Sequence, residues 1–187
     1  ISQRFNFLDG QRNDLVKAKK DLEKVISEMQ NVIKKIFSEQ FEIIGSEFNK
    51  VFGELFEGGR ASLRLTDPED VLESGIEIEV QPSGKQLQNM QLLSGGEKAL
   101  TAIALLLAIL KVRPTPFCIL DEIDAALDDV NVTRYASYIK KFSDKTQFIL
   151  ITHKRGTMEM SNMLYGVTMQ EKGVSSVLEL NLEEVEK

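Results

Sequence analysis

Two apolar runs of the sequence end in side chains that can do chemistry. Asp121 and Glu122 follow "FCIL", and His153, the only histidine of the chain, follows "FILIT". A carboxylate at the end of a buried strand can hold a hydrated Mg²⁺, and a second carboxylate beside it can orient and activate an attacking water. An imidazole at the same place can hydrogen-bond a terminal phosphate or that water. The pattern predicts a site for phosphoryl transfer, with a solvated acidic cluster and a structural histidine as the alternatives.

A further group of residues, Ser94, Gly95, Gly96 and Glu97, precedes an apolar helix. Ser94 and Glu97 have the spacing of a capping box, which is the simplest interpretation of the segment. A cap does not need two glycines, which are poor helix formers. Because they lack Cβ atoms, they leave the free backbone N–H groups and the positive end of the helix dipole open to an anion. The segment is therefore also a candidate phosphate-binding edge.

Alternating helices and apolar strands must position these side chains. The predicted strands lie near residues 61–66, 76–81, 117–121, 147–152, 164–169 and 174–181, and the predicted helices at 97–112, 130–142 and 155–162. This order is typical of an α/β fold with a mostly parallel sheet flanked by helices. The runs "FCIL" and "FILI" are apolar at every position, which indicates strands buried on both faces. Because parallel strands end at one edge of a sheet, we expect Asp121 and His153 to emerge side by side.

The first part of the chain has a different pattern. Apolar residues recur every seven positions, at Leu8, Leu15, Leu22, Met29, Ile36 and Ile43. Lysine and acidic side chains lie between them, as on a solvated helix. Such a heptad seam needs a partner helix, and the sequence holds no second heptad run that could fold back on it. We expect the partner to come from another chain or from another part of a longer protein; an amphipathic helix docked on its own domain is the alternative.

Composition restricts the class of protein. The 187 residues are 42% hydrophobic, which suits one or two compact domains with a core. The net charge of −6 gives no overall positive field, so a DNA contact would have to be local. The single cysteine, Cys118, lies in an apolar run, which favours a buried small side chain and a reducing compartment. The longest apolar run, at 99–110, is too short to span a membrane, and we find no secretory signal, so we expect a cytoplasmic protein.

The motifs, taken together, resemble a known family. "LSGGE" before an apolar helix, a strand ending in Asp121 and Glu122, "AALD" after it and a histidine ending the next strand are similar to the signature motif, Walker B motif, D-loop and switch histidine of ABC-type ATPases. The wording "LLSGGEKALTAIALLLAIL" with "QFILITHKRGTMEM" resembles the bacterial branch of the SMC (structural maintenance of chromosomes) family. The resemblance implies the C-terminal lobe of an ABC-type ATPase head at residues 51–187. It also implies the end of a coiled-coil arm and a neck helix at residues 1–50.

The resemblance implies a role for each site residue. Asp121 would bind Mg²⁺, mainly through water, Glu122 would be the general base for ATP hydrolysis, and His153 would sense the γ-phosphate. Two heads would face each other, and residues of one head would bind the ATP held by the other. The residues with this implied cofactor-binding role come from the signature motif and the D-loop: Ser94, Gly95, Gly96, Glu97 and Asp128.

The sequence contains no phosphate-binding loop of the form G-x-x-x-x-G-K-[ST]. The nearest segment, "PSGKQ" at 82–86, has Gln86 where Ser or Thr should follow the lysine. In the SMC family, that Walker A loop and the Q-loop belong to the N-terminal half of the polypeptide, which returns through an antiparallel coiled coil. The resemblance therefore implies that half as a partner, together with a second SMC head, DNA and a kleisin subunit. The kleisin would contact the coil around residues 8–45 and the distal face of the head at the closing strands.

The function implied by the resemblance is an ATPase that organises chromosomes in the nucleoid and is active only when completed by the N-terminal half and a second head. A transporter ATPase subunit should carry its own Walker A loop and no heptad arm, so the sequence argues against it. Two other interpretations stay open: a recombination or repair ATPase of the wider SMC-like superfamily, and a non-catalytic scaffold at the end of a coiled coil.

Overall fold

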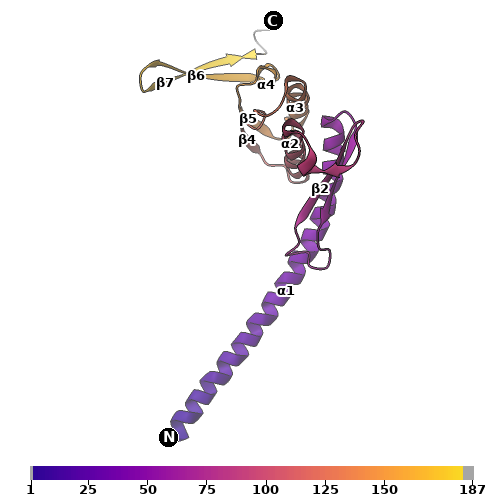
Figure 1. Ribbon diagram of the computed structural model, residues 1–187. Helices are drawn as coiled ribbons and strands as arrows, with labels where there is room; N and C mark the ends of the chain where they lie inside the picture. The colour runs from indigo at the N-terminus through magenta and orange to yellow at the C-terminus, as the bar shows by residue number, and fades with distance from the viewer. Residues whose placement is uncertain (1, 183–187) are drawn as a thin grey trace. The chain divides into compact units, whose positions relative to one another are not determined.

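The computed structural model describes residues 2–182 and divides the chain into two compact units. The first unit contains the residues up to Ile43 together with Leu65–Gly75, and the second contains Ile44–Arg64 and the residues from Ile76 onward. Figure 1 shows the elements and labels most of them. In chain order they are α1 (Ser2–Leu55), β1 (Gly59–Leu65), β2 (Ile76–Pro82), β3 (Gln88–Asn89), the 3₁₀ turn η1 (Met90–Leu92), α2 (Gly95–Val112), β4 (Phe117–Asp121), α3 (Asp129–Phe142), β5 (Gln147–Ile151), α4 (Arg155–Glu159), β6 (Met163–Glu171) and β7 (Val174–Asn181).

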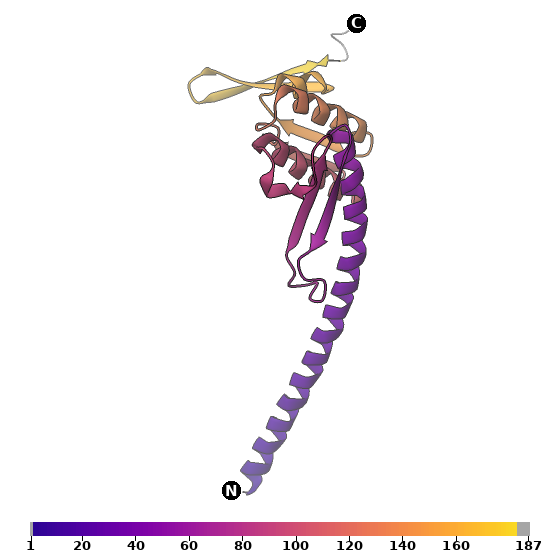
Figure 2. The same cartoon turned by 45° about the vertical axis from the view of Figure 1, so that its right-hand side comes forward.

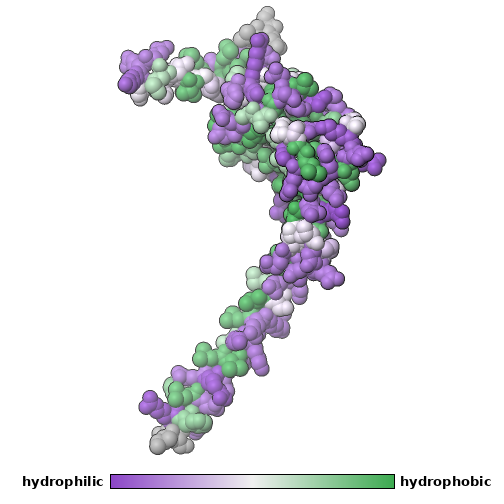
Figure 3. Space-filling model, viewed as in Figure 1, coloured by the Kyte–Doolittle hydropathy of each residue, from purple (hydrophilic) through white to green (hydrophobic). Residues whose placement is uncertain are grey.

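The first unit contains most of α1, and the helix predicted from the heptad pattern is confirmed. Its seam residues are largely exposed, Leu15 and Leu22 among them. Figure 3 shows hydrophobic and hydrophilic residues interleaved along this part of the helix. Pairs of oppositely charged side chains one turn apart, such as Lys19 with Glu23, lie on the solvated side. Within the described residues, the seam is therefore an apolar stripe in contact with solvent.

The second unit has one apolar core built on three helices. The last turns of α1 contribute Phe48, Val51 and Phe52, which are fully buried, and the Phe52 ring stacks on Phe56 with centroids 4.0 Å apart. Helix α2 is largely apolar, and its buried residues belong to the same core cluster as Phe48 of α1 and Leu120 of β4. Helix α3 contributes a single buried stripe. The core members on α2 and α3 are Leu100, Ile103, Ala104, Leu107, Ala108, Leu110, Val132, Tyr135, Tyr138 and Ile139.

A small sheet of order β1-β2-β3 covers one part of this core, and Figure 2 shows β1 and β2 running side by side. Strand β3 and the turn η1 were not predicted, because two paired residues give no periodic signal. The pairing of β2 with β3 is antiparallel. At the start of β1, Gly59 has φ +93°, and a Cβ atom there would collide with the carbonyl oxygen of Gln81. Only glycine fits this close approach of two strands.

Strands β4 and β5 form a parallel pair in register from Phe117 and Gln147 to Asp121 and Ile151. The prediction of one mostly parallel sheet holds for this pair alone. The described strands form three separate sheets, and both β2–β3 and β6–β7 are antiparallel. The physical reason is the connection: β6 and β7 are joined by a tight turn at Gly173, which only an antiparallel pair permits.

The prediction that β4 and β5 are buried on both faces is wrong for this chain. Leu120 is 5% exposed and faces the core, whereas Ile119 beside it is 56% exposed. The same alternation runs through β5, where Ile149 and Ile151 are exposed and Phe148 and Leu150 pack on the core. One side of the parallel pair is therefore an open apolar face, which we call the β4–β5 face and define by Phe117, Ile119, Ile149 and Ile151.

None of the helices in the part of the chain that the structure describes combines the length and apolar character needed to cross a membrane.

Candidate functional site

The carboxyl ends of β4 and β5 place Asp121 and Glu122 at one edge of the parallel pair. Asp121 is the last residue of β4, opposite Ile151 in the register, and its side chain is exposed. The amide of Glu122 donates a hydrogen bond to the carbonyl oxygen of Ile151 at 2.8 Å. Glu122 also adopts a positive φ of 49°, which a residue with a Cβ atom rarely does. Backbone conformations of this kind often occur at functional sites.

His153 meets Glu122 across this edge. The Nδ1 atom of His153 lies 3.8 Å from Oε1 of Glu122, and both side chains are 62% exposed. The distance is longer than a hydrogen bond, so the two groups can admit or share a small polar ligand or a water. The structure thus brings together Glu122 and His153, which the sequence places 31 residues apart, beside the end of the strand that carries Asp121.

Asp124 lies deeper in the same loop and was missed as a site residue. For Asp124 the sequence leaves a functional role and a place in a solvated acidic cluster about equally open, and burial of the side chain at 2% exposure excludes the solvated cluster. Its Oδ2 atom accepts hydrogen bonds from the hydroxyl groups of Thr152 at 2.7 Å and Thr157 at 2.6 Å. Those partners lie 28 and 33 residues further along the chain. No local sequence pattern links residues so far apart.

The start of α2 is a complete capping box, as the spacing of Ser94 and Glu97 predicts. The Glu97 amide donates to Oγ of Ser94 at 3.4 Å, and the Ser94 amide donates to Oε2 of Glu97 at 3.2 Å. The Ser94 hydroxyl itself donates to the same carboxylate at 2.8 Å. A Cβ atom added at Gly95 would meet open space, whereas one at Gly96 would lie 3.4 Å from the carbonyl oxygen of Ala126. The Gly95 side of the helix tip is therefore open to an approaching anion.

Lys85 is a second residue that sequence reasoning did not assign. It follows the β2–β3 turn at Gly84, and its Nζ atom donates to Oε1 of Glu97 at 2.7 Å. This bond is the main reason that the pKa of Glu97 is lowered; burial raises the pKa, and the hydrogen bonds from Ser94 lower it further. The segment "PSGKQ" is thus a turn that supports the capping box.

Asp128 is the N-cap of α3. Its two carboxylate oxygens accept hydrogen bonds from the backbone N–H of Asn131 at 2.8 Å and from the Asn131 side-chain amide at 3.1 Å. Arg134, one turn further along α3, donates to the Asn131 side chain at 3.3 Å and to Glu57 at 2.7 Å. The exposed Asp128 side chain therefore has a structural role as a helix cap.

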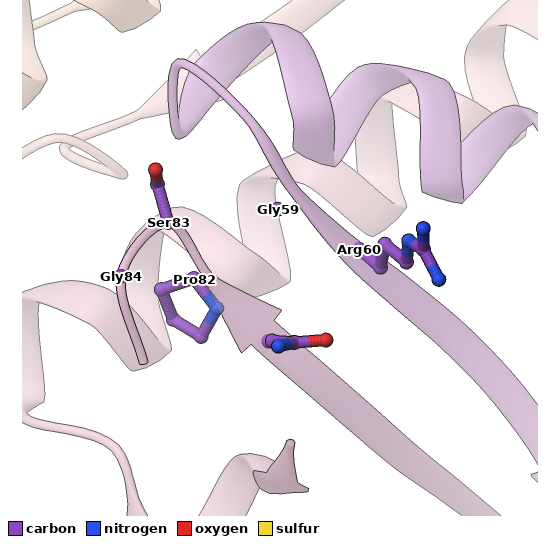
Figure 4. Close-up of a pocket in the computed structure, with 6 residues that line it drawn as sticks. Gly59, Arg60, Pro82, Ser83 and Gly84 are labelled. Atoms are coloured by element: carbon purple, nitrogen blue, oxygen red, sulfur yellow. The ribbon is translucent and has the colours of Figure 1, made fainter. Parts of the chain in front are cut away.

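An open depression of about 390 Å³ lies elsewhere, between the start of β1 and the β2–β3 turn. Figure 4 shows its lining residues, with Ser83 and Arg60 pointing in different directions. It contains none of the predicted site residues, and its lining residues are Gly59, Arg60, Gln81, Pro82, Ser83 and Gly84.

Within residues 2–182, no group of three or more His, Cys, Asp or Glu side chains is arranged to hold a metal ion.

Comparison with known proteins gives consistent matches. The family model described as the RecF/RecN/SMC N terminal domain matches residues 6–176. The Chromosome partition protein Smc of Bacillus subtilis (strain 168) is 59% identical over 187 residues, which is 100% of this chain and 16% of that protein. The Smc protein of Clostridium kluyveri (strain NBRC 12016) is 56% identical over 97% of this chain and 15% of its own length. The chain thus spans about one sixth of the length of the curated relatives that it matches.

A solved structure shows the same fold. The Smc head domain of Pyrococcus furiosus, solved with an extended coiled coil and bound to the C-terminal domain of ScpA, has a TM-score of 0.77 and 42% sequence identity, covering 99% of this chain and 46% of that one. This likeness confirms an α/β fold with a long N-terminal helix of the kind seen in SMC heads. With the family model matched over 171 of its 187 residues, the chain belongs to the RecF/RecN/SMC N terminal domain family.

Proposed function

We propose that this chain is the C-terminal lobe of the ATP-hydrolysing head of a chromosome-partition SMC protein. Residues 1–50 would be the end of the coiled-coil arm with the neck helix, and residues 51–187 the lobe that carries the signature motif, Walker B motif, D-loop and switch histidine. The observation that carries the proposal is the approach of Glu122 and His153 to 3.8 Å beside the strand end that holds Asp121. The high identity to Smc proteins supports the same assignment.

The residues at the strand edge fit ATP with Mg²⁺. Asp121 is exposed and makes no ion pair within residues 2–182, and a single carboxylate suits a magnesium ion that takes its other ligands from water and phosphate oxygens. That ion would neutralise charge on the phosphates. Glu122 would orient the attacking water and accept its proton. Its carboxylate is exposed and faces the ring of His153. The His153 imidazole would hydrogen-bond the terminal phosphate and so detect its presence.

The signature motif would bind nucleotide held by a second head. Its open side at Gly95 presents free backbone N–H groups and the positive end of an eighteen-residue helix. The Ser94 hydroxyl donates to Glu97 in this chain, so contact with a phosphate would redirect that hydroxyl, while Glu97 stays held by Lys85. Gly96 and Asp128 would complete the contact, because the Asp128 side chain stays exposed while it bonds Asn131.

Two apolar surfaces support the proposed partner within the head. The β4–β5 face would be covered by the N-terminal half that carries Walker A and the Q-loop, because an apolar side of a parallel pair is normally buried. The exposed seam of α1 would pair with the antiparallel helix of that half. ATP hydrolysis would then need three components: this lobe, its N-terminal half and a second complete head.

Further partners follow from relatives. A solved structure with 44% identity and a TM-score of 0.75 belongs to work on ATP-driven dimerisation and DNA-stimulated activation of SMC ATPases, and the P. furiosus head is bound to ScpA. By analogy, we propose three partners for the present protein: a second head in an ATP-dependent dimer, DNA on the engaged heads, and a kleisin subunit. The exposed hairpin β6–β7, with Tyr165, Val167 and Val177 on one face, would receive the kleisin C-terminal domain. The protein would act on the nucleoid in the cytoplasm.

The test is reconstitution. The 187-residue chain is mixed with the matching N-terminal half, and Mg-ATP hydrolysis and dimerisation are measured. We expect no turnover from the chain alone and turnover from the mixture. Glu122→Gln should stall hydrolysis and accumulate ATP-dependent dimers, and Ser94→Arg in that background should abolish those dimers because a long cation fills the open helix tip.

Ser143→Arg provides the matched control, since Ser143 is an exposed residue at the C-terminal end of α3, remote from the strand edge that carries Asp121. It should leave dimers and turnover unchanged. Robust turnover by the chain alone would contradict the proposal. Unchanged turnover of the reconstituted head with Glu122→Gln would instead support a non-catalytic scaffold.

A further inference from the structure

The loop after β4 and the segment after β5 are joined by several hydrogen bonds on both sides of His153. The Glu122 amide donates to the Ile151 carbonyl at 2.8 Å, and Lys154 Nζ donates to the Leu127 carbonyl at 3.0 Å. A third hydrogen bond joins the same two segments: the Thr152 hydroxyl donates to the buried Asp124 carboxylate at 2.7 Å. The residues immediately before and after His153 are therefore both tied to the loop that carries Glu122.

Thr152 also shapes the turn around His153. Its Oγ1 atom donates to Asp124 and accepts a hydrogen bond from the backbone N–H of Lys154 at 2.9 Å. The His153 backbone is thus enclosed by a side-chain turn, while its ring stays exposed. Thr157, which is buried in α4, donates to the same Oδ2 atom at 2.6 Å and anchors the far end of the segment.

Packing alone does not explain why a carboxylate occupies position 124. The carboxylate is buried, and its Oδ1 atom has no hydrogen-bond partner among the described residues. An unpaired buried acceptor is unfavourable, and an apolar side chain of similar size would avoid it. The neighbouring Tyr135 is affected too: burial raises the pKa of its hydroxyl, and the Asp124 charge raises it further. A carboxylate kept in such a place calls for a role beyond filling space.

We propose that Asp124 is a positioning residue that sets the distance between Glu122 and His153. It does so by holding Thr152 and Thr157 to the loop in which Glu122 adopts its left-handed backbone. The inference rests on the proposed function, because it assigns catalytic roles to Glu122 and His153. Asp124 itself touches neither the nucleotide nor the attacking water; it acts through the two residues that do.

The test uses the full-length protein that carries this chain. Asp124→Asn keeps the size of the side chain but removes the negative charge that strengthens both threonine hydrogen bonds, and it should lower kcat by about tenfold to a hundredfold, the range expected of a displaced catalytic group. The KM for ATP should change by less than about threefold, because the phosphate-binding groups stay in place. In a His153→Ala background, Asp124→Asn should lower kcat by less than about twofold further, since the two residues act as one unit.

Thr146→Val is the control for stability. Thr146 is buried, and its hydroxyl bonds the Thr115 carbonyl at 2.8 Å at the opposite end of β5. It should lower the melting temperature about as much as Thr152→Val while leaving kcat unchanged, whereas Thr152→Val should lower kcat. If Asp124→Asn does not fold, Thr152→Val and Thr157→Val carry the same test.

The possible outcomes distinguish failure of the proposed function from failure of the positioning role of Asp124. If Glu122→Gln and His153→Ala leave turnover intact, the proposed function fails. If those two variants lose turnover but the Asp124 and Thr152 variants change only the melting temperature, or if their effects on kcat add fully to that of His153→Ala, the positioning role alone is overturned.

Discussion

Four of the five acidic side chains in residues 121–129 show four different environments. Asp121 is exposed at the strand end, and Glu122 is exposed on a left-handed turn. Asp124 is buried beneath two threonine hydroxyls, and Asp128 caps a helix. The sequence shows only a run of like charges in "DEIDAALDD". Burial and hydrogen-bond partners, which depend on residues far along the chain, decide what each carboxylate can do.

Glu97 gives a prediction that depends on pH. Glu97→Gln should lower the free energy of unfolding of the reconstituted head by about 1 kcal/mol at pH 7, because it weakens the capping box and removes the ion pair with Lys85. The pKa of Glu97 is lowered from its ordinary value of 4.5 in the folded protein. The stabilisation is therefore present above pH 4.5 and is lost as pH falls through the lower folded-state pKa.

The measurement is denaturant unfolding of both proteins at several pH values. The difference between them should be constant from neutral pH down to about pH 5.5 and should narrow below 4.5. Glu77→Gln, which changes an exposed residue of β2, should show no difference at any pH. A difference that widens on acidification would mean that the Glu97 carboxylate does not carry the effect.

At the scale of elements, the sequence located helices and strands where their own pattern was strong. Helix α2 and strands β4 and β5 agree with the predicted ranges to within two residues, because each is a continuous apolar run bounded by polar residues. How the strands assemble could not be read in this way. "FCIL" looks the same whether one or both faces are covered, and only the structure shows that Ile119 is exposed while Leu120 is buried.

The same distinction between local patterns and long-range contacts applies to the candidate site. The capping box of Ser94 and Glu97 was predictable, since both residues lie within one helical turn. The link from Lys85 to Glu97 and the link from Thr152 to Asp124 were not, since they join residues 12 and 28 positions apart. Local spacing encodes caps, whereas tertiary contacts of polar side chains have no periodicity to detect.

The β4–β5 face gives a prediction at this scale. Ile119→Lys should weaken association with the N-terminal half by about tenfold or more, because a buried ammonium group without a partner is costly to desolvate. Binding of the two halves can be measured by calorimetry. Ile76→Lys is the matched control, since Ile76 is an exposed isoleucine on β2 and should leave the affinity unchanged. Equal losses of affinity in both variants would point to a general effect of added charge.

At the scale of the whole molecule, α1 runs without interruption from Ser2 to Leu55, but its two parts differ in what supports them. The residues around Leu15 and Leu22 expose their seam, whereas Phe48 and Phe52 are buried in the core of the second unit. Tertiary packing, more than intrinsic propensity, stabilises helices in proteins. Backbone hydrogen exchange in the two parts of one helix should therefore differ.

In the isolated chain, amides of residues 8–40 should exchange rapidly and those of residues 48–55 slowly. In the full-length protein, where a partner helix would cover the seam, exchange in the first range should slow by at least about tenfold. Mass spectrometry of the peptides reads both ranges in one experiment. Equal protection of residues 8–40 in both samples would show that the seam needs no partner helix.

The left-handed backbone at Glu122 also matters for protein engineering. Glycine adopts such a conformation more easily than any residue with a Cβ atom. A screen that rewards heat tolerance alone would therefore favour glycine at this position and discard the carboxylate that faces His153. Thermal stability and the proposed catalytic role of Glu122 make opposite demands on this residue, so laboratory evolution of the protein must score both traits together.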